Sequence, residues 1–233
     1  MRNRPLKIGI IDSGINISRI NRKSYIGGVN IGVKDDSILP FGDGLDSARN
    51  GHGTTCARII HKISPGSHIY SIKVLNSKNK CSVRAIAGGI QWAMEQKLDI
   101  LNISIAANNH ALLDVLKPVC REAYRKNILI VAAKENNVTS PSYPADLDTV
   151  IAVDYRIIRD PRKSLNIFRF NHALISLRAS IKEAIHEKST WVWLNVLSNS
   201  YMTACITGSI AQNMWKQQVT DIRVIHKDLN KFI

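Results

Sequence analysis

The chain has 233 residues, of which 45% are hydrophobic, and it carries a formal net charge of +14. This length suits one domain with a buried core, and no apolar run approaches the roughly 18 residues that cross a bilayer. The basic surface attracts acidic molecules in general, but the sequence lacks the aromatic-interleaved basic pattern of RNA-binding modules. We therefore expect no membrane insertion and no specific nucleic-acid partner.

The N-terminus and the cysteines indicate the cellular compartment. The first residues are basic and lead into a short apolar run that ends at Asp12, which differs from a secretory signal peptide. The cysteines are scattered without metal-ligand spacing, so free thiols are favoured over disulfides. They are Cys56, Cys81, Cys120 and Cys205. We expect a cytoplasmic protein that forms one domain over residues 1–233, with no visible signal peptide or prodomain.

Short apolar runs alternate with amphipathic stretches along most of the chain. They predict strands at 6–11, 27–33, 68–75, 99–105, 127–133 and 149–153. They predict helices at 54–63, 82–96 (capped by Ser82), 111–126 and 199–214, and a short terminal helix or strand in 217–233. This alternation predicts an α/β fold with three layers, helix–sheet–helix, around a mostly parallel central sheet. Residues 156–197 show no clear period, with strand-like pieces at 166–170 and 191–196.

Three polar residues stand at the ends of predicted elements. Asp12 ends the first strand, where open α/β sheets place their sites. His52 lies between two glycines at the start of a helix, and histidine is the side chain most ready to move protons near neutral pH. Ser200 opens the last long helix, whose dipole favours negative charge on its oxygen. Aspartate, histidine and serine in this chain order match one known order of a catalytic triad.

Each of these residues also has an ordinary structural interpretation. Asp12 alone could be a turn residue, and His52 alone could be a buried structural histidine. Ser200 could cap its helix without a catalytic role, and Ser198 is an alternative nucleophile. Asn136, in a polar turn after a predicted strand, could be a simple turn residue. Their joint occurrence in this order and context favours catalysis.

The motifs around these residues resemble those of subtilisin-like serine proteases (subtilases). Asp12-Ser13-Gly14 resembles the family's Asp-Ser/Thr-Gly motif, and residues 51–57 resemble its Gly-His-Gly-Thr-His-Val-Ala motif. Residues 199–201 begin a poorer match to Gly-Thr-Ser-Met-Ala-Ala-Pro. Residues 101–105 look like the family's substrate-flanking strand, and residues 131–136 look like the strand that ends in its oxyanion-hole asparagine.

The resemblance implies peptide-bond hydrolysis through an acyl-enzyme. Ser200 would attack the carbonyl, His52 would carry the proton, and Asp12 would orient the imidazole. The Ser200 N–H and the Asn136 amide would bind the oxyanion. The residues implied in substrate binding are Asn102, Ser104, Ile105, Ala106, Ala133 and Glu135. No cofactor and no metal are expected, although Asp43 and Asp46 form a weak candidate pair.

The sequence departs from the family pattern at several positions. Ser198 stands at the usual glycine, Ala204 at the usual proline, and Cys205 at a position that is often histidine. Glu135 replaces a small residue just before the oxyanion asparagine. It is either a solvated loop carboxylate or a charge that favours Lys or Arg before the cleaved bond.

The chain is short for the family and shows no prodomain. Compact subtilases of this type resemble the cytoplasmic kind, which includes leader proteases that trim ribosomally made peptides such as lanthipeptides. Acidic leader peptides would suit a basic enzyme. The expected partner is therefore a peptide or protein substrate, with an acidic leader peptide as one candidate. A general intracellular protease is the near alternative. A degenerate subtilase that binds peptides without cleaving them and, on charge alone, a nucleic-acid-binding protein are the other classes.

Overall fold

The computed structural model describes residues 4–35, 37–46, 51–107, 113–135, 141–154 and 198–233. Its strands are β1 (Lys7–Asp12), β2 (Tyr25–Lys34), β3 (Ser37–Phe41), β4 (His68–Lys73), β5 (Ile100–Ile103), β6 (Leu129–Ala133) and β7 (Val150–Val153). They form one sheet in the order β3-β2-β4-β1-β5-β6-β7. Every neighbouring pair is parallel except β2 and β3, which form an antiparallel hairpin.

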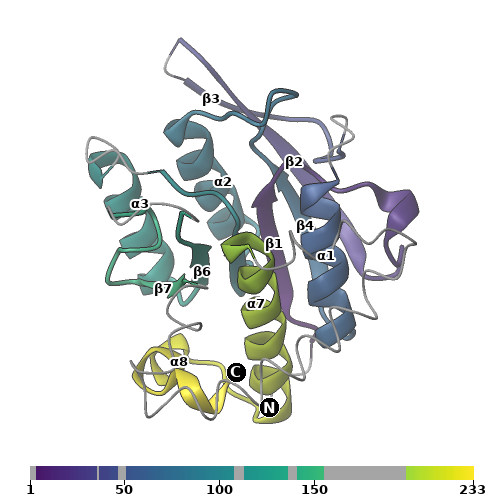
Figure 1. Cartoon of the computed structure of the whole chain (residues 1–233), viewed down its shortest axis with the longest axis vertical. Coiled ribbons are helices and arrows are strands. Elements are labelled where there is room, and N and C mark those ends of the chain that lie inside the picture. Colours follow the sequence, from purple (N-terminus) through teal and green to yellow (C-terminus); the bar gives the residue numbers. More distant parts are fainter. Residues whose placement is uncertain (1–3, 36, 47–50, 108–112, 136–140, 155–197) are drawn as a thin grey trace.

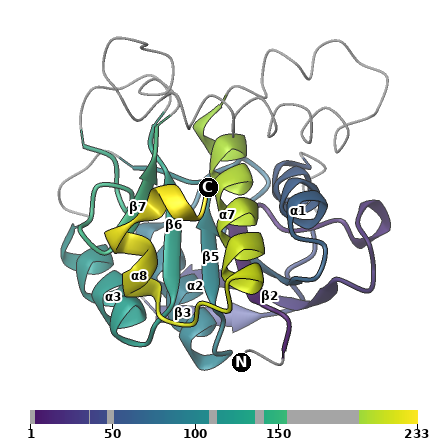
Figure 2. The same ribbon diagram turned by 90° about the horizontal axis from the view of Figure 1, so that it is seen from below.

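Helices cover both faces of the sheet. They are α1 (His52–Ile63), α2 (Val83–Glu95), α3 (Leu113–Arg125), α7 (Asn199–Lys216) and α8 (Ile222–Lys227), with the 3-10 turns η1 (Ile17–Arg19) and η3 (Leu229–Lys231). Helices α1 and α7 pack together on one face, and α2 and α3 lie on the other (Figure 1 and Figure 2). The predicted three-layer, mostly parallel α/β fold is therefore confirmed.

The central strand β1 is buried on both faces, which explains its nearly continuous apolar sequence. Ile8 and Ile10 pack with α1 and α7, whereas Ile11 packs into the opposite layer with α2 and α3. Gly9 faces that second layer, where a Cβ atom would lie 2.7 Å from both Leu98 Cδ1 and Leu101 Cδ2. Glycine at this position therefore allows the second helical layer to pack closely against the centre of the sheet.

Most predicted elements are confirmed, with shifts of a few residues at their ends. Helix α1 begins two residues before the predicted start, and β5 ends at Ile103 instead of residue 105. The terminal segment forms α8 followed by η3. The prediction missed β3, whose residues are mostly exposed at the edge of the sheet and include Pro40. The strand-like pieces at 166–170 and 191–196 lie outside the described residues.

Candidate active site

Asp12 is held rigidly at the carboxyl end of β1. Its side chain is 1% exposed, and the Ser13 N–H donates a 2.7 Å hydrogen bond to its Oδ1. The Asp12 carbonyl accepts from the Val74 N–H at 2.9 Å and from the Leu75 N–H at 3.3 Å. Because both its backbone and its side chain are hydrogen-bonded, Asp12 holds its carboxylate in a fixed position at the carboxyl end of the central strand.

His52 is the first residue of α1 and lies against this carboxylate. Its Nδ1 is 2.9 Å from Asp12 Oδ1 and 2.8 Å from Oδ2. Gly51 precedes it with φ +67°, in the left-handed region that favours glycine. Gly53 follows, and a Cβ atom there would lie 2.4 Å from the Gly14 carbonyl oxygen. The two glycines therefore let the start of α1 approach the end of β1 with main chain against main chain.

Asp12 controls the charge and the tautomer of His52. Burial lowers the pKa of His52, but the charge of Asp12 and its hydrogen bond outweigh this effect and raise the pKa above its ordinary value of 6.5. Since Asp12 accepts from Nδ1, the neutral imidazole keeps its lone pair on Nε2, the nitrogen that can take a proton. The His52 side chain is 29% exposed, so the ring remains accessible. This pair has the geometry of an oriented general base.

Ser200 lies in the first turn of α7, directly before a residue that contacts His52. The ring of its neighbour Tyr201 stacks on the His52 imidazole, with a centroid distance of 5.1 Å. The Ser200 hydroxyl donates a 3.2 Å hydrogen bond to the Ser104 carbonyl. Ser198 is the N-cap of α7, because its Oγ accepts from the Tyr201 N–H at 3.4 Å. In this conformation the Ser200 proton points to the main chain after β5, and its role as nucleophile stays a prediction.

Asn199 ties the start of α7 to the end of β6. This side chain is 1% exposed, and its Nδ2 donates to the carbonyls of Lys134 at 2.8 Å and Glu135 at 3.3 Å. The segment that follows β6 is therefore hydrogen-bonded to the residue directly before Ser200. Asn136, the expected oxyanion donor, lies outside the described residues.

The segment that follows β5 contains several of the expected substrate-binding residues. Ser104, Ile105 and Ala106 are half-buried and follow the last residue of the strand. Asn102 is completely buried: its amide donates to Ser104 Oγ at 2.9 Å, and its Oδ1 accepts from the Thr207 hydroxyl at 3.1 Å. Ala133 is also buried, with 2% exposure. The Asn102 side chain thus links β5 to α7 and has no free surface for a substrate.

Three residues near the site were not singled out from the sequence. They are Cys56, Asn199 and Tyr201. Asn199 and Tyr201 flank the candidate serine, so their positions in the motif were the available signal. Cys56 lies one turn after His52, and its Sγ is 3.6 Å from Ser104 Oγ.

Cys56 also forms the group most suited to a metal ion among the described residues. Its Sγ and ligand atoms of Asp12 and His52 all lie within 4.8 Å of one another. A metal bound through His52 Nδ1 would have to replace the proton that this nitrogen shares with Asp12. Burial and the charge of Asp12 raise the pKa of the Cys56 thiol, which disfavours the thiolate that a metal would need. The arrangement therefore suits proton transfer better than metal binding.

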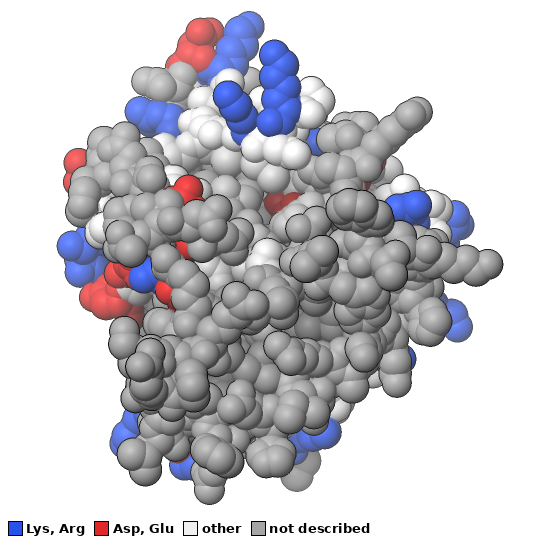
Figure 3. Space-filling view, viewed as in Figure 1, with Lys and Arg blue, Asp and Glu red and all other residues white. Residues whose placement is uncertain are grey.

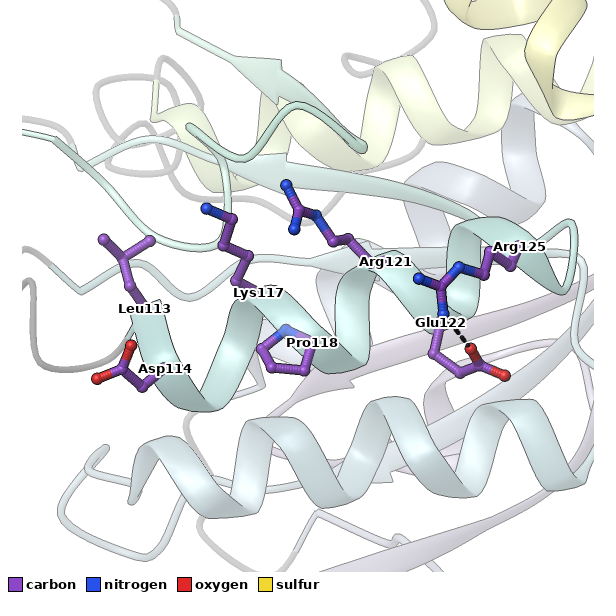
Figure 4. Close-up of a pocket in the computed structure, with 7 residues that line it drawn as sticks. All are labelled: Leu113, Asp114, Lys117, Pro118, Arg121, Glu122 and Arg125. Atoms are coloured by element: carbon purple, nitrogen blue, oxygen red, sulfur yellow. Dashed lines mark hydrogen bonds and ion pairs between the residues drawn. The ribbon is translucent and has the colours of Figure 1, made fainter.

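A separate pocket lies along α3 and holds none of the candidate site residues. Its volume is about 570 Å³ (Figure 4). It is lined by Leu113, Asp114, Lys117, Pro118, Arg121, Glu122 and Arg125. Figure 4 shows Arg125 turned to Glu122, which it contacts at 3.1 Å, and Arg121 lies 3.7 Å from Asp148. These pairs offset part of its positive charge, so the pocket does not form a purely basic site.

The cysteines, the surface charges and the apolarity of the helices can be compared with the sequence-based expectations. All four cysteines are free, as predicted. On the described part of the face in Figure 3, Lys and Arg side chains are distributed around the rim with Asp and Glu among them. Within the described ranges, no helix has the length and apolarity needed to cross a membrane.

Comparisons with known proteins give the family of the chain. The model of the subtilase family (Peptidase_S8) matches residues 3–162. Subtilisin DY from Bacillus licheniformis is 34% identical over 162 residues, which cover 64% of this chain and 55% of that protein. The major intracellular serine protease of Bacillus subtilis (strain 168) is 29% identical over 174 residues, covering 66% and 51%. The chain thus spans about half the length of these curated relatives.

Solved structures of similar fold agree with this assignment. The epidermin leader peptide processing serine protease from Staphylococcus aureus has a TM-score of 0.63 and 15% identity, covering 99% of this chain and 68% of its own. A lanthipeptide protease has a TM-score of 0.61 and 16% identity, covering 95% and 78%. At such low identity these neighbours establish the fold alone. On the family match and the shared fold, the chain belongs to the subtilase family.

Proposed function

We propose that this chain is a serine endopeptidase that cleaves peptide bonds through Asp12, His52 and Ser200. The observation that carries the proposal is the buried, doubly contacted Asp12–His52 pair, with distances of 2.8 and 2.9 Å. Membership of the subtilase family supports the reaction class. Ser200 directly precedes Tyr201 in the first turn of α7, and the Tyr201 ring stacks on the imidazole.

The reaction begins when Ser200 Oγ leaves the Ser104 carbonyl and turns to His52 Nε2. As Oγ bonds to the substrate carbonyl carbon, the imidazole takes the hydroxyl proton and the Asp12 carboxylate stabilises the resulting imidazolium. The oxyanion accepts hydrogen bonds from the Ser200 N–H and the Asn136 amide. His52 then gives its proton to the leaving amine. Water, activated in the same way, hydrolyses the acyl-enzyme and frees Ser200.

The proposed substrate class is the leader region of a ribosomally made precursor peptide. Two structural neighbours are described as a lanthipeptide protease and a leader peptide processing protease, and they cover 95% and 99% of this chain. A net charge of +14 would attract an acidic leader. The free cysteines support a reducing cytoplasm. We also propose that residues 1–233 act as one peptidase domain.

A fluorophosphonate probe tests the central claim, because it labels only an activated serine. The purified chain should be labelled, and peptide mapping should place the label on Ser200. Ser200→Ala should abolish both labelling and cleavage of a peptide library. Ser198→Ala is the matched control, since it removes a neighbouring hydroxyl that only caps α7. A folded protein that is not labelled but still binds peptides would establish the alternative, a peptide-binding module without activity.

A further inference from the structure

One carboxylate oxygen in the segment after β6 has no hydrogen-bond partner among the described residues. It is the buried Oε2 of Glu135, which follows β6 by two residues. Burying a carboxylate oxygen without hydrogen bonds is unfavourable, so such atoms are normally paired. This oxygen is therefore available to accept a hydrogen bond from a cationic group of another molecule.

The backbone of Glu135 is fixed on both sides. Its N–H donates to Ser142 Oγ at 3.1 Å, and its carbonyl accepts from Asn199 Nδ2 at 3.3 Å. The Glu135 carbonyl is thus hydrogen-bonded to Asn199, the residue directly before the proposed nucleophile Ser200. The charge is thus attached to a rigid part of the site.

The nearest cation in the sequence is already paired with another carboxylate. Lys134 Nζ lies 2.9 Å from Asp146 Oδ1, and both side chains are largely buried. The other Asp146 oxygen accepts from the Ser142 N–H at 2.7 Å. Lys134 is therefore already paired with Asp146, and the Glu135 carboxylate makes no ion pair within the described residues.

The strand register brings Glu135 to the same end of the sheet as Ser104. Strands β5 and β6 are parallel neighbours, with Ile103 opposite Ala132, so Ser104 and Glu135 follow adjacent strand ends. Ligands of open α/β sheets bind outside these carboxyl ends. Ser200 bonds to the Ser104 carbonyl and Asn199 bonds to the Glu135 carbonyl, so a peptide with its scissile carbonyl at Ser200 would pass close to both segments.

We propose that Glu135 binds the cationic side chain of the substrate residue just before the cleaved bond and so selects Arg or Lys there. This inference rests on the proposed peptidase function. A charge-assisted hydrogen bond in a partly buried site corresponds to roughly 10- to 100-fold in the specificity constant. Selectivity of this size separates a recognition residue from a solvated loop carboxylate.

The test compares peptides that differ only at the residue before the cleaved bond: arginine, its neutral isostere citrulline, and leucine. The wild-type chain should cleave the arginine peptide at least about tenfold more efficiently than the citrulline peptide. Glu135→Gln keeps the side-chain shape and removes the charge, so the ratio should fall to nearly one. Glu95→Gln is the matched control, because it removes an exposed carboxylate at the end of α2 and should leave the ratio unchanged.

Binding to the Ser200→Ala chain keeps the test independent of catalysis. Fluorescence polarisation with labelled peptides should show the same preference for arginine over citrulline, and adding Glu135→Gln should remove it. An unchanged arginine-to-citrulline ratio after Glu135→Gln would overturn the inference while leaving the peptidase function intact. Conversely, charge-dependent binding without labelling of Ser200 would support the role of Glu135 and reject the peptidase function.

Discussion

The contact between Asp12 and His52 predicts that Asp12→Asn removes most of the activity while the fold is kept. The imidazolium formed during the reaction lies about 3 Å from the carboxylate, and at an effective dielectric constant of 20 their attraction is on the order of 5 kcal/mol. Loss of that attraction lowers kcat by about 10³- to 10⁴-fold. Asparagine has nearly the same volume and can still accept from the Ser13 N–H.

The assay measures kcat with a fluorogenic peptide and follows the His52 pKa by NMR titration. Without Asp12, burial alone acts on His52, so its pKa should fall below 6.5. Asp99→Asn is the control: this carboxylate is also buried, but it pairs with Arg4 at 2.7 and 2.8 Å at the amino-terminal end of β5, whereas Asp12 lies at the carboxyl end of β1. Asp99→Asn should change stability and leave kcat within about threefold. A kcat for Asp12→Asn within tenfold of wild type, or an unchanged His52 pKa, would refute the reasoning.

Three further predictions concern pH, packing and bracing. Because the pKa of His52 is raised, kcat/KM should rise with pH through a midpoint above 6.5. The charged His52 stabilises the folded state below pH 6.5, and this stabilisation should be lost as the pH rises through that midpoint. A midpoint below 6.5 in the pH–rate profile would contradict this. Gly53→Ala forces a Cβ against the Gly14 carbonyl and should cost about 1–3 kcal/mol in urea unfolding, with a loss of activity, whereas an unchanged midpoint would show that the contact is not tight. Asn199→Ala leaves two carbonyls after β6 without their donor and should cost about 1–3 kcal/mol; equal stability, measured by the same unfolding experiment, would argue that water replaces the amide.

The parts of the fold that were predicted correctly are those whose signals are local. Strand β1 and helix α1 have continuous or periodic apolar residues, and Ser82 caps α2 as expected, accepting from the Arg84 N–H. Strand β3 gave no such signal, because at the edge of the sheet its residues face solvent and Pro40 is tolerated. Patterns of burial can identify an element only where that element is buried.

The site could be predicted only as far as its motifs extend. Asp12 and His52 lie in short motifs, and the structure brings them together as expected. The role of Asn102 depends on the Thr207 hydroxyl, 105 residues away, and the role of Asn199 depends on carbonyls after β6. Such long-range partners leave no trace in local spacing, so these two contacts could not be predicted from the sequence.

The close approach of Gly53 to Gly14 has a consequence for how this scaffold can vary. Where Gly53 faces the Gly14 carbonyl, neither residue has a side chain that could separate the start of α1 from the segment after β1. Substitutions in the hydrophobic core should therefore change the distance between Asp12 and His52 very little. The distances between Asp12 and His52 should therefore persist when loops elsewhere on the scaffold are exchanged.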